Sequence, residues 1–343
     1  MNRIFLFVAI VICQKFSTAQ PVDSTYAEKL GFPKGAKVVI LHVDDVGMSW
    51  DSNEGAIQSI TNGVANSCSV MMPCSWVPGF VQFYKKHPMI DVGLHLTLTS
   101  EWNQYRWPPL SGAKNVPGLV DKEGVMWASV EDVVKHASAD EVETEIKAQV
   151  ERALLMGFVP THLDSHMGTL FGSPQFIERY LKVGMEYKIP VMFPAGHATL
   201  IKAQMKMPDA QIEQIRLLGK QLWDAGLPLI DDLHNESYGW ELPKNIQAST
   251  KNIQQFKTGN YIKALKSLKP GITMIIMHCT APSEIFNKIS SSGQTRKGDL
   301  LAMMDPAFKK ALADQKIILT TWRELKERRD KIMIPDLKIG ASQ

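Results

Sequence analysis

The sequence predicts an α/β fold, a single TIM-like (β/α) barrel whose outline could be distorted, with long loops over its mouth. Eight short apolar or β-branched runs occur along the 343 residues, and each is followed by a stretch with helical character. Several runs, such as residues 272–277, are apolar almost without interruption, which is typical of parallel strands covered on both faces. Eight β-then-α units favour one barrel, although the length alone would allow two domains.

The expected strands are these eight runs, in chain order residues 38–45, 65–72, 91–98, 161–166, 190–194, 227–234, 272–279 and 316–322. Two long stretches between them, residues 100–139 and 235–258, are interpreted as loops over the mouth of the barrel, since long connections of this kind run over the surface and carry function.

Helix signals stand between the strands. Three residue pairs have the spacing of helix starts: Asp51 with Glu54, Asp140 with Glu143, and Ser173 with Pro174. Residues 140–156 repeat apolar side chains at helical spacing up to Gly157, which predicts a helix that ends at this glycine.

The two chain ends are expected to lie outside the barrel. Residues 1–19 combine an early Arg3, the apolar run Ile4–Cys13 and small residues up to Ala19, which predicts a secretory signal peptide. The run is too short to span a bilayer, which needs about 20 residues. We therefore expect a secreted or periplasmic protein, cleaved near Ala19, without stable membrane insertion. The expected divisions are a leader at 20–36, the barrel domain at 37–330 and a C-terminal tail at 331–343.

Charge and cysteine content narrow the possible partners. Lys plus Arg number 38 and Asp plus Glu 35, a formal net charge of +3, and no basic run occurs. The balance gives no support for a nucleic-acid partner, and the sequence leaves a homodimer open.

Cys13 would leave with the signal peptide, whereas Cys68 and Cys74 could form a disulfide. No cysteine spacing indicates structural zinc.

Acids and histidines gather at the carboxyl ends of the expected strands, which converge on one face of a parallel barrel. Five strands share this feature, through Asp44-Asp45, His95, Asp164-Ser165-His166, residues 231–234 and His278. Two adjacent carboxylates need a cation or a shared proton between them. A simpler interpretation makes the first pair helix caps and His95 a core histidine.

One carboxylate and two imidazoles that arrive from different strands match the open three-ligand set of a catalytic metal site. A divalent ion there would lower the pKa of its bound water toward 7 and polarise a substrate carbonyl. The second carboxylate could then act as general base and His278 as general acid. This arrangement suits the hydrolysis of an unactivated amide or ester.

Five short motifs resemble, in order, those of the YdjC-like carbohydrate deacetylases. They are Asp44-Asp45-Val46-Gly47 followed by Asn53-Glu54-Gly55-Ala56-Ile57, Gly93-Leu94-His95-Leu96-Thr97-Leu98, His162-Leu163-Asp164-Ser165-His166, His278, and Arg296-Lys297-Gly298-Asp299-Leu300. The resemblance spans residues 37–326 and implies a distorted barrel of the polysaccharide-deacetylase kind.

The resemblance also implies an activity: the metal-dependent removal of acetyl groups from N-acetylated amino sugars. It implies that Asp45, His95 and His166 hold the divalent ion, magnesium or zinc, that Asp44 is the base and that His278 is the acid. The implied partner is an amino-sugar oligosaccharide, which the signal peptide would place outside the cytoplasm.

Three positions depart from the family pattern. Val46 stands where the family has phenylalanine, Gly168 where it has a histidine, and Cys279 where it has proline. Because the missing histidine could alter substrate contacts, no particular sugar is carried over from characterised members.

Five further residues are candidates for substrate binding: Trp102, Asp164, Asp232, His234 and Arg296. Trp102 could stack on a pyranose ring, or it could anchor a small core within its own loop. Asp232 and His234 could bind sugar hydroxyls, support other residues of the site, or equally form a strand-end ion pair. Arg296 could hold the base aspartate or a substrate group, or equally lie on the polar surface.

Two other functions stay open. A glycoside hydrolase would use two of the carboxylates Asp44, Asp164, Asp232 and Glu284, and it would keep its activity in a chelator. A catalytically silent glycan-binding barrel would bind sugars without releasing acetate.

Overall fold

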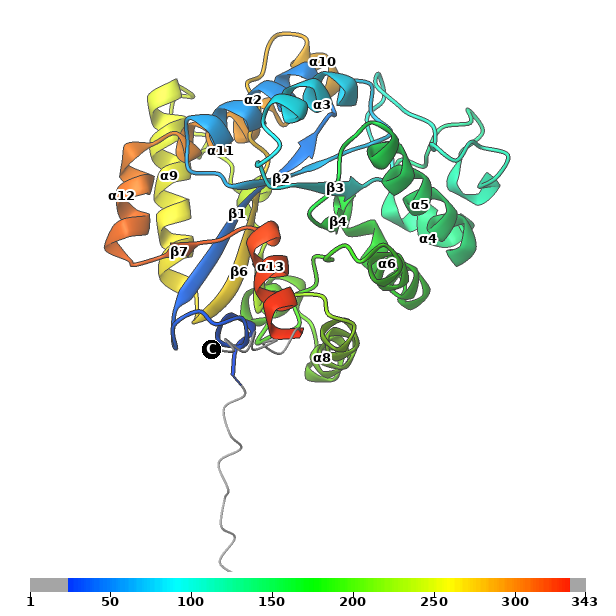
Figure 1. The fold of residues 1–343 in the computed structure, drawn as a ribbon. Coiled ribbons are helices and arrows are strands. Elements are labelled where there is room, and N and C mark those ends of the chain that lie inside the picture. The colour runs from blue at the N-terminus through cyan, green and yellow to red at the C-terminus, as the bar shows by residue number, and fades with distance from the viewer. Residues whose placement is uncertain (1–23, 334–343) are drawn as a thin grey trace, which may run out of the picture.

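The computed structural model describes residues 24–333, which form a parallel sheet surrounded by helices (Figure 1). The sheet order is β4-β3-β2-β1-β6-β5, and all neighbouring strands are parallel. The strands are β1 Lys37–Val46, β2 Ser67–Val70, β3 Val92–Leu96, β4 Leu163–Ser165, β5 Asp232–His234, β6 Gly271–Met277 and β7 Ile318–Leu319. The predicted α/β fold with parallel strands is confirmed.

The barrel is irregular at two places. The fifth expected strand, residues 190–194, contributes only isolated bridges, which link β4 to the residues before β5. The last strand, β7, pairs with Val38 and Val39 of β1. β6 pairs along one edge of β1, so β7 and β2 share the opposite edge. β7 pairs near the start of β1, and β2 pairs near its end. Within the described residues, seven of the eight expected strands form and residues 190–194 do not, so the barrel is distorted, as the sequence allowed.

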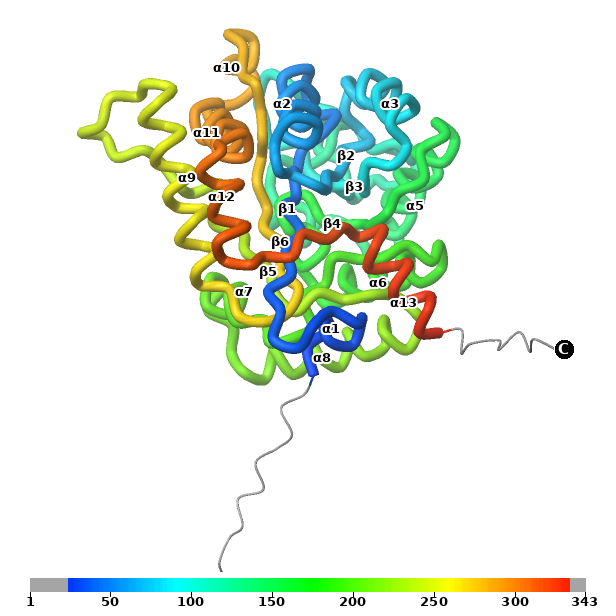
Figure 2. The backbone as a smooth tube through the Cα atoms, turned by 60° about the vertical axis from the view of Figure 1, so that its left-hand side comes forward, coloured from blue at the N-terminus to red at the C-terminus, as the bar shows by residue number. Residues whose placement is uncertain are grey.

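Helices connect the strands and cover the outside of the sheet (Figures 1 and 2). The α-helices are α1 Tyr26–Lys29, α2 Trp50–Thr61, α3 Val77–Lys86, α4 Val130–His136, α5 Ala139–Leu155, α6 Pro174–Tyr187, α7 Thr199–Met205, α8 Asp209–Asp224, α9 Thr250–Ser267, α10 Phe286–Ile289, α11 Gly293–Met303, α12 Pro306–Asp314 and α13 Trp322–Met333. Three short 3₁₀-helices are η1 Pro117–Leu119, η2 His166–Phe171 and η3 Ser237–Gly239. Among the described residues, no helix has the length and apolar character needed to cross a membrane.

Two of the three expected helix caps were wrong. α2 begins after Ser49 and α5 after Ser138, each two residues before the expected acid, and each serine accepts the backbone N–H three residues further on. A serine hydroxyl in extended backbone is as good a cap as an aspartate, so the earlier residue is used. Asp51 lies inside α2, and its carboxylate accepts a backbone N–H from the segment after β6. The cap at Ser173 is confirmed.

The two expected mouth loops are only partly irregular. Residues 100–139 contain η1 and α4, and residues 235–258 contain η3 and the first half of α9. The start of α9 was missed because its buried face includes the polar side chains of Lys257 and Thr258, which hide the apolar spacing. The helix expected to end at Gly157 is α5, and this glycine has a φ of 75°.

The segment expected as a leader packs against the barrel through α1. The carboxylate of the buried Asp231 accepts backbone N–H groups from Tyr26 at 2.8 Å, Ala27 at 3.2 Å and Ile272 at 2.8 Å. One side chain therefore joins α1 to β6, at the end of the barrel opposite the carboxyl ends of the strands (Figure 1). The predicted signal peptide and most of the predicted tail lie outside the described residues.

Replacing Asp231 with alanine is expected to lower the free energy of unfolding by about 2–4 kcal/mol, because three buried N–H groups lose a charged acceptor. Urea unfolding measures the difference, and the exposed Asp209→Ala serves as the control with an unchanged midpoint. A loss below about 0.5 kcal/mol, the range of ordinary surface changes, would contradict this role.

The disulfide considered from the sequence does not form. Cys68, Cys74 and Cys279 are free and buried. Cys68 lies in the main core, whereas Cys74 belongs to a separate small cluster around Trp107, so the two side chains pack in different places.

Candidate active site

A break in the regular pleat of β1 brings Asp44 and Asp45 to the same site. Consecutive side chains of a regular strand point to opposite faces. In β1 the register with β2 shifts between Val43 and Val46, and Asp45 has a φ of 63°, in the left-handed region. This bulge turns the second carboxylate back beside the first, and both reach His95, whose Nε2 lies 3.8 Å from Asp44 Oδ2 and 3.3 Å from Asp45 Oδ1.

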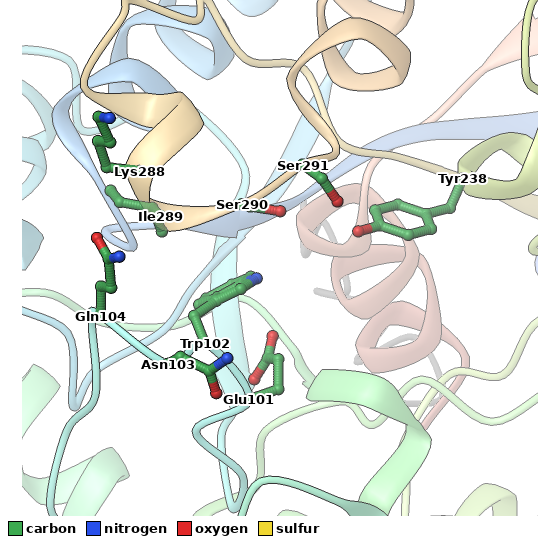
Figure 3. A pocket seen from close by; sticks show the side chains of 9 residues that line it. All are labelled: Glu101, Trp102, Asn103, Gln104, Tyr238, Lys288, Ile289, Ser290 and Ser291. Atoms are coloured by element: carbon green, nitrogen blue, oxygen red, sulfur yellow. The ribbon is translucent and has the colours of Figure 1, made fainter.

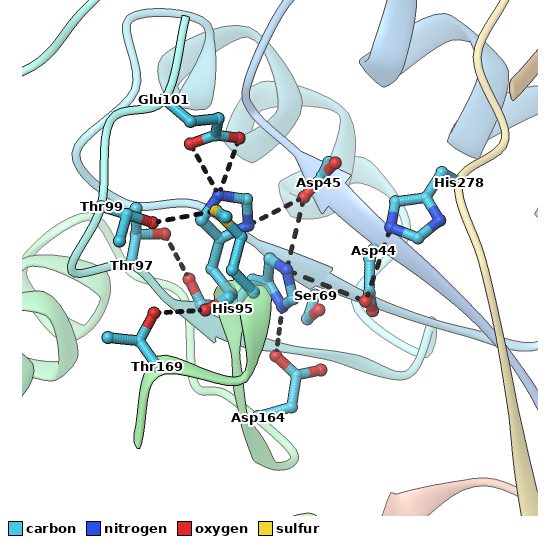
Figure 4. Close-up of polar contacts among 12 residues, drawn as sticks. Asp44, Asp45, Ser69, His95, Thr97, Thr99, Glu101, Asp164, Thr169 and His278 are labelled. Carbon is cyan, nitrogen blue, oxygen red and sulfur yellow. Dashed lines mark hydrogen bonds and ion pairs between the residues drawn. The ribbon is translucent and has the colours of Figure 1, made fainter. Parts of the chain in front are cut away.

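Asp45, His95 and His166 converge on one point. Figure 4 shows Asp45 beside His95 in this group. Asp45 Oδ1 lies 3.3 Å from His95 Nε2 and 3.3 Å from His166 Nδ1. All three side chains are buried, and Asp45 Oδ1 accepts no hydrogen bond within the described part of the chain. Ligand atoms held about 2.0–2.1 Å from a tetrahedral ion are separated by about 3.4 Å. The three residues named from the sequence therefore fit a divalent metal ion.

Each of these three side chains uses its second polar atom, the one that does not face the common point, to contact a partner that fixes its orientation. The pairs are Asp164 Oδ1 with His95 Nδ1 at 2.6 Å, Glu101 Oε1 and Oε2 with His166 Nε2 at 3.1 Å each, and Arg296 Nη1 with Asp45 Oδ2 at 2.7 Å. Asp164 and Arg296, both candidates for substrate binding, are buried, and these contacts join them to the cluster.

Opposite charges shift the pKa values within the cluster. Burial opposes the ionised form of Asp45, but the guanidinium of Arg296 and the nearby imidazoles hold its pKa well below its usual range. Burial also opposes the protonated form of His166, but Glu101 and Asp45 outweigh it and raise its pKa to about 9. Such an acidic setting attracts cations, so a metal ion would displace protons when it binds.

Asp44 and His278 lie beside the cluster, at the ends of adjacent strands. Asp44 Oδ2 is 4.0 Å from His278 Nε2. Burial lowers the pKa of His278, and Asp45 offsets only part of this effect, so the ring is neutral at neutral pH. The backbone N–H of His278 donates to Asp299 Oδ2 at 3.0 Å. This places a neutral imidazole where it could exchange a proton with Asp44.

A cleft of about 410 Å³ opens beside the cluster (Figure 3). Glu101 and Trp102 line one side, and Tyr238 lies across from them with two serines. Glu101 also contacts His166, and the ring of Tyr238 lies 4.9 Å from that of His278. The cleft therefore adjoins the cluster on one side and His278 on the other.

The aromatic loop after β3 buries one tryptophan and lines the cleft with another. Trp102 is half-buried, lines the cleft and lies 6.4 Å from the ring of His166. Its neighbour Trp107, 5.6 Å away, is buried in a small core with Met48 and Phe286. Trp107 thus anchors the loop, and Trp102 faces the cleft.

Two predicted residues have contacts elsewhere. The Asp232 carboxylate accepts the backbone N–H groups of Leu200 and Ile201 at the start of α7. The ring of His234 packs on Trp240 at 5.4 Å. The structure gives neither of them a contact with the cluster in the described part of the chain, and their role in substrate binding stays a prediction.

Sequence reasoning missed His42, Glu101 and Tyr238. His42 precedes Asp44 by two residues, so the period of the strand could have placed it on the same face. Glu101 and Tyr238 lie in irregular segments, where no spacing indicates the direction of a side chain. Only the packing of these segments brings them to the site.

Comparison with known proteins identifies the family. The model of the YdjC-like protein family matches residues 38–314. A carbohydrate deacetylase of Thermus thermophilus is 31% identical over 300 residues, covering 88% of this chain and 97% of that protein. A chitooligosaccharide deacetylase of Proteus mirabilis is 24% identical over 297 residues, covering 84% and 99%.

One solved structure shows a similar fold over most of the chain. A protein of Enterococcus faecalis, described as a cellobiose-phosphate cleavage protein, superposes with a TM-score of 0.66 and 21% identity, covering 84% of this chain and 99% of that one. The order of the motifs, the distorted parallel barrel and the family match over most of the length agree with one another. The chain belongs to the YdjC-like protein family.

Proposed function

We propose that this chain is a metal-dependent carbohydrate deacetylase that removes acetyl groups from N-acetylated amino-sugar oligosaccharides. The observation that carries the proposal is the convergence of Asp45, His95 and His166, with Asp44 and His278 beside them and an open cleft next to the group. The similarity to proteins named carbohydrate deacetylases supports the choice of substrate class.

The donor set indicates the kind of metal ion. Two imidazole nitrogens and one carboxylate oxygen suit zinc and similar ions better than magnesium, which prefers oxygen ligands. When bound, the ion would supply an activated water and polarise the acetyl carbonyl.

The residues of the chain would handle the protons. Asp44 takes a proton from the attacking water, whose oxygen forms a bond to the acetyl carbon. His278 gives a proton to the sugar nitrogen as the C–N bond breaks, which releases acetate and a free amine. Because the ring of His278 starts neutral, it first takes up the proton collected by Asp44, whose Oδ2 lies 4.0 Å from its Nε2. Arg296 holds Asp45 in place through the 2.7 Å contact.

Acetate release from a panel of N- and O-acetylated glycans tests the proposal. We expect release from N-acetylated amino sugars, loss of release in EDTA and recovery when metal is added back. A folded, metal-replete sample that releases acetate from none of the glycans would refute it. Activity that survives the chelator would instead favour a glycoside hydrolase.

Trp102→Ala is expected to raise KM about 2- to 10-fold with little change in kcat, because stacking on an aromatic ring contributes about 0.5–1.5 kcal/mol. Steady-state acetate release on a soluble oligosaccharide measures both constants. Trp50→Ala, at a tryptophan that is 53% exposed and does not line the cleft, is the matched control and should leave KM unchanged. A fall in kcat alone would contradict a role in substrate binding.

We also propose that the protein is exported. The early arginine, the apolar run and the small residues up to Ala19 support a cleaved signal peptide. Cell fractionation with N-terminal sequencing tests this: we expect a mature chain outside the cytoplasm that begins near Gln20. An uncleaved chain in the cytoplasm would refute export.

A further inference from the structure

His42 is buried in β1 between two carboxylates of the site. Its Nε2 lies 2.9 Å from Asp164 Oδ2 and 3.2 Å from Asp44 Oδ1. Two serines of β2 hold the ring, with Ser67 Oγ 2.9 Å from Nδ1 and Ser69 Oγ 3.0 Å from Nε2. The imidazole is therefore fixed in one orientation while it touches both acids.

The two carboxylates serve different parts of the site. Asp164 orients His95 through its other oxygen, at 2.6 Å, whereas Asp44 lies beside His278. Neither Asp44 Oδ1 nor Asp164 Oδ2 has a hydrogen-bond partner among the described residues, and His42 Nε2 lies within ion-pair distance of both. His42 is the group that separates these two negatively charged oxygens.

We propose that His42 is a positioning residue for the deacetylation: it joins Asp44 to Asp164 and, through Asp164, to His95, so that base and metal ligand keep a fixed spacing. The inference rests on the proposed function for the roles of Asp44 and His95. It concerns a residue that touches neither the substrate cleft nor the three side chains that fit the metal ion.

The charges of the site support this assignment. Four carboxylates gather here, those of Asp44, Asp45, Asp164 and Glu101. Arg296 and a divalent ion would balance three of them, and a protonated His42 would balance the fourth. Burial opposes the protonated form, but Asp164 and Asp44 raise the pKa of His42 to about 9. The neighbouring His162, 4.9 Å away, differs, because burial lowers its pKa.

His42→Gln tests the role, because glutamine stays polar but carries no charge and lacks the two ring nitrogens through which Ser67 and Ser69 fix the orientation of His42. We expect kcat to fall about 10- to 100-fold, as for other groups that orient metal ligands, with KM within about twofold and one metal ion still bound. His162→Gln is the matched control. It removes a second buried imidazole, 3.7 Å from Asp164 Oδ2, and should keep kcat within about threefold, the change expected without a contact to Asp44.

Nitrogen NMR of wild-type protein with isotope-labelled histidine reports the protonation of His42 directly. This readout depends neither on enzymatic activity nor on whether a variant folds. We expect both ring nitrogens of His42 to be protonated at neutral pH, with and without metal. A neutral His42, or a His42→Gln protein with wild-type kcat, would overturn the inference. Two bound metal ions, one of them lost in His42→Gln, would also overturn it, because His42 would then be a ligand with His162 and Asp164.

The same experiments separate this inference from the proposed function. A wild-type protein that is loaded with metal but releases no acetate refutes the proposed deacetylase function. The NMR result still decides whether His42 is protonated between the two acids. An active wild type with a neutral His42 refutes only the inference.

Discussion

Asp45→Asn is expected to lower kcat/KM by about 10³-fold or more and to abolish metal binding. A neutral amide is a poor ligand, and a catalytic metal ion contributes several kcal/mol to the stabilisation of the transition state, at about 1.4 kcal/mol for each factor of ten. The substitution also leaves the guanidinium of Arg296, now 2.7 Å from Asp45 Oδ2, without its counter-ion. Metal content by elemental analysis and acetate release measure the two effects.

Asp51→Asn is the matched control for this loss. Asp51 is a buried carboxylate in the next helix, α2, and it accepts the backbone N–H of Ser283 at 2.6 Å. It does not belong to the group of Asp45, His95 and His166 that fits a metal ion. Its variant should keep the metal ion and most of the activity. An Asp45→Asn protein that holds stoichiometric metal and stays within tenfold of the wild-type rate would refute the role of Asp45 as a ligand.

Asp44→Asn should reduce kcat by about 10²–10⁴-fold, the usual contribution of a general base, while the metal ion stays bound. The amide keeps the shape of the side chain but cannot accept a proton from water. Stopped acetate-release assays at saturating substrate, with metal content measured on the same sample, test this result.

The metal content of Asp44→Asn distinguishes the roles of the two neighbouring aspartates. If this variant loses its metal, Asp44 belongs to the ligand set. If it keeps wild-type kcat, another group is the base. Only low kcat with full metal content agrees with the assignment of Asp45 to the metal and Asp44 to the proton.

The fold followed from local patterns wherever a strand buries both faces. β1 begins with the apolar residues 38–41 and β6 is almost wholly apolar, and their observed bounds differ from the expected ones by at most two residues. Residues 190–194 failed as a strand because the short run makes only single bridges to its neighbours. α9 was missed in part, since Lys257 is buried through an ion pair with Asp299 at 2.9 Å, and an ion pair leaves no apolar signal.

The site was predictable where its residues end strands. His95 and His166 were found because parallel strands bring their carboxyl ends to one face, whatever the details of the loops. Glu101 and Tyr238 were not found, because irregular segments have no period that fixes the direction of a side chain. Arg296 was found, but its partner was not, since the 2.7 Å contact with Asp45 joins α11 to β1 across the barrel.

The order of residues along the chain was sufficient to show which chemical groups the mouth of the barrel holds and from which strands they come. That information is local, because it depends on apolar runs and on the residue that follows each run. The convergence of Asp44 and Asp45 on His95, and the place of His42 between two acids, depend on tertiary structure. A regular strand would point the two aspartates apart, and the bulge with its positive φ at Asp45 brings them together. Such a bulge forms where neighbouring strands and charges stabilise it, and those neighbours lie far away in the sequence.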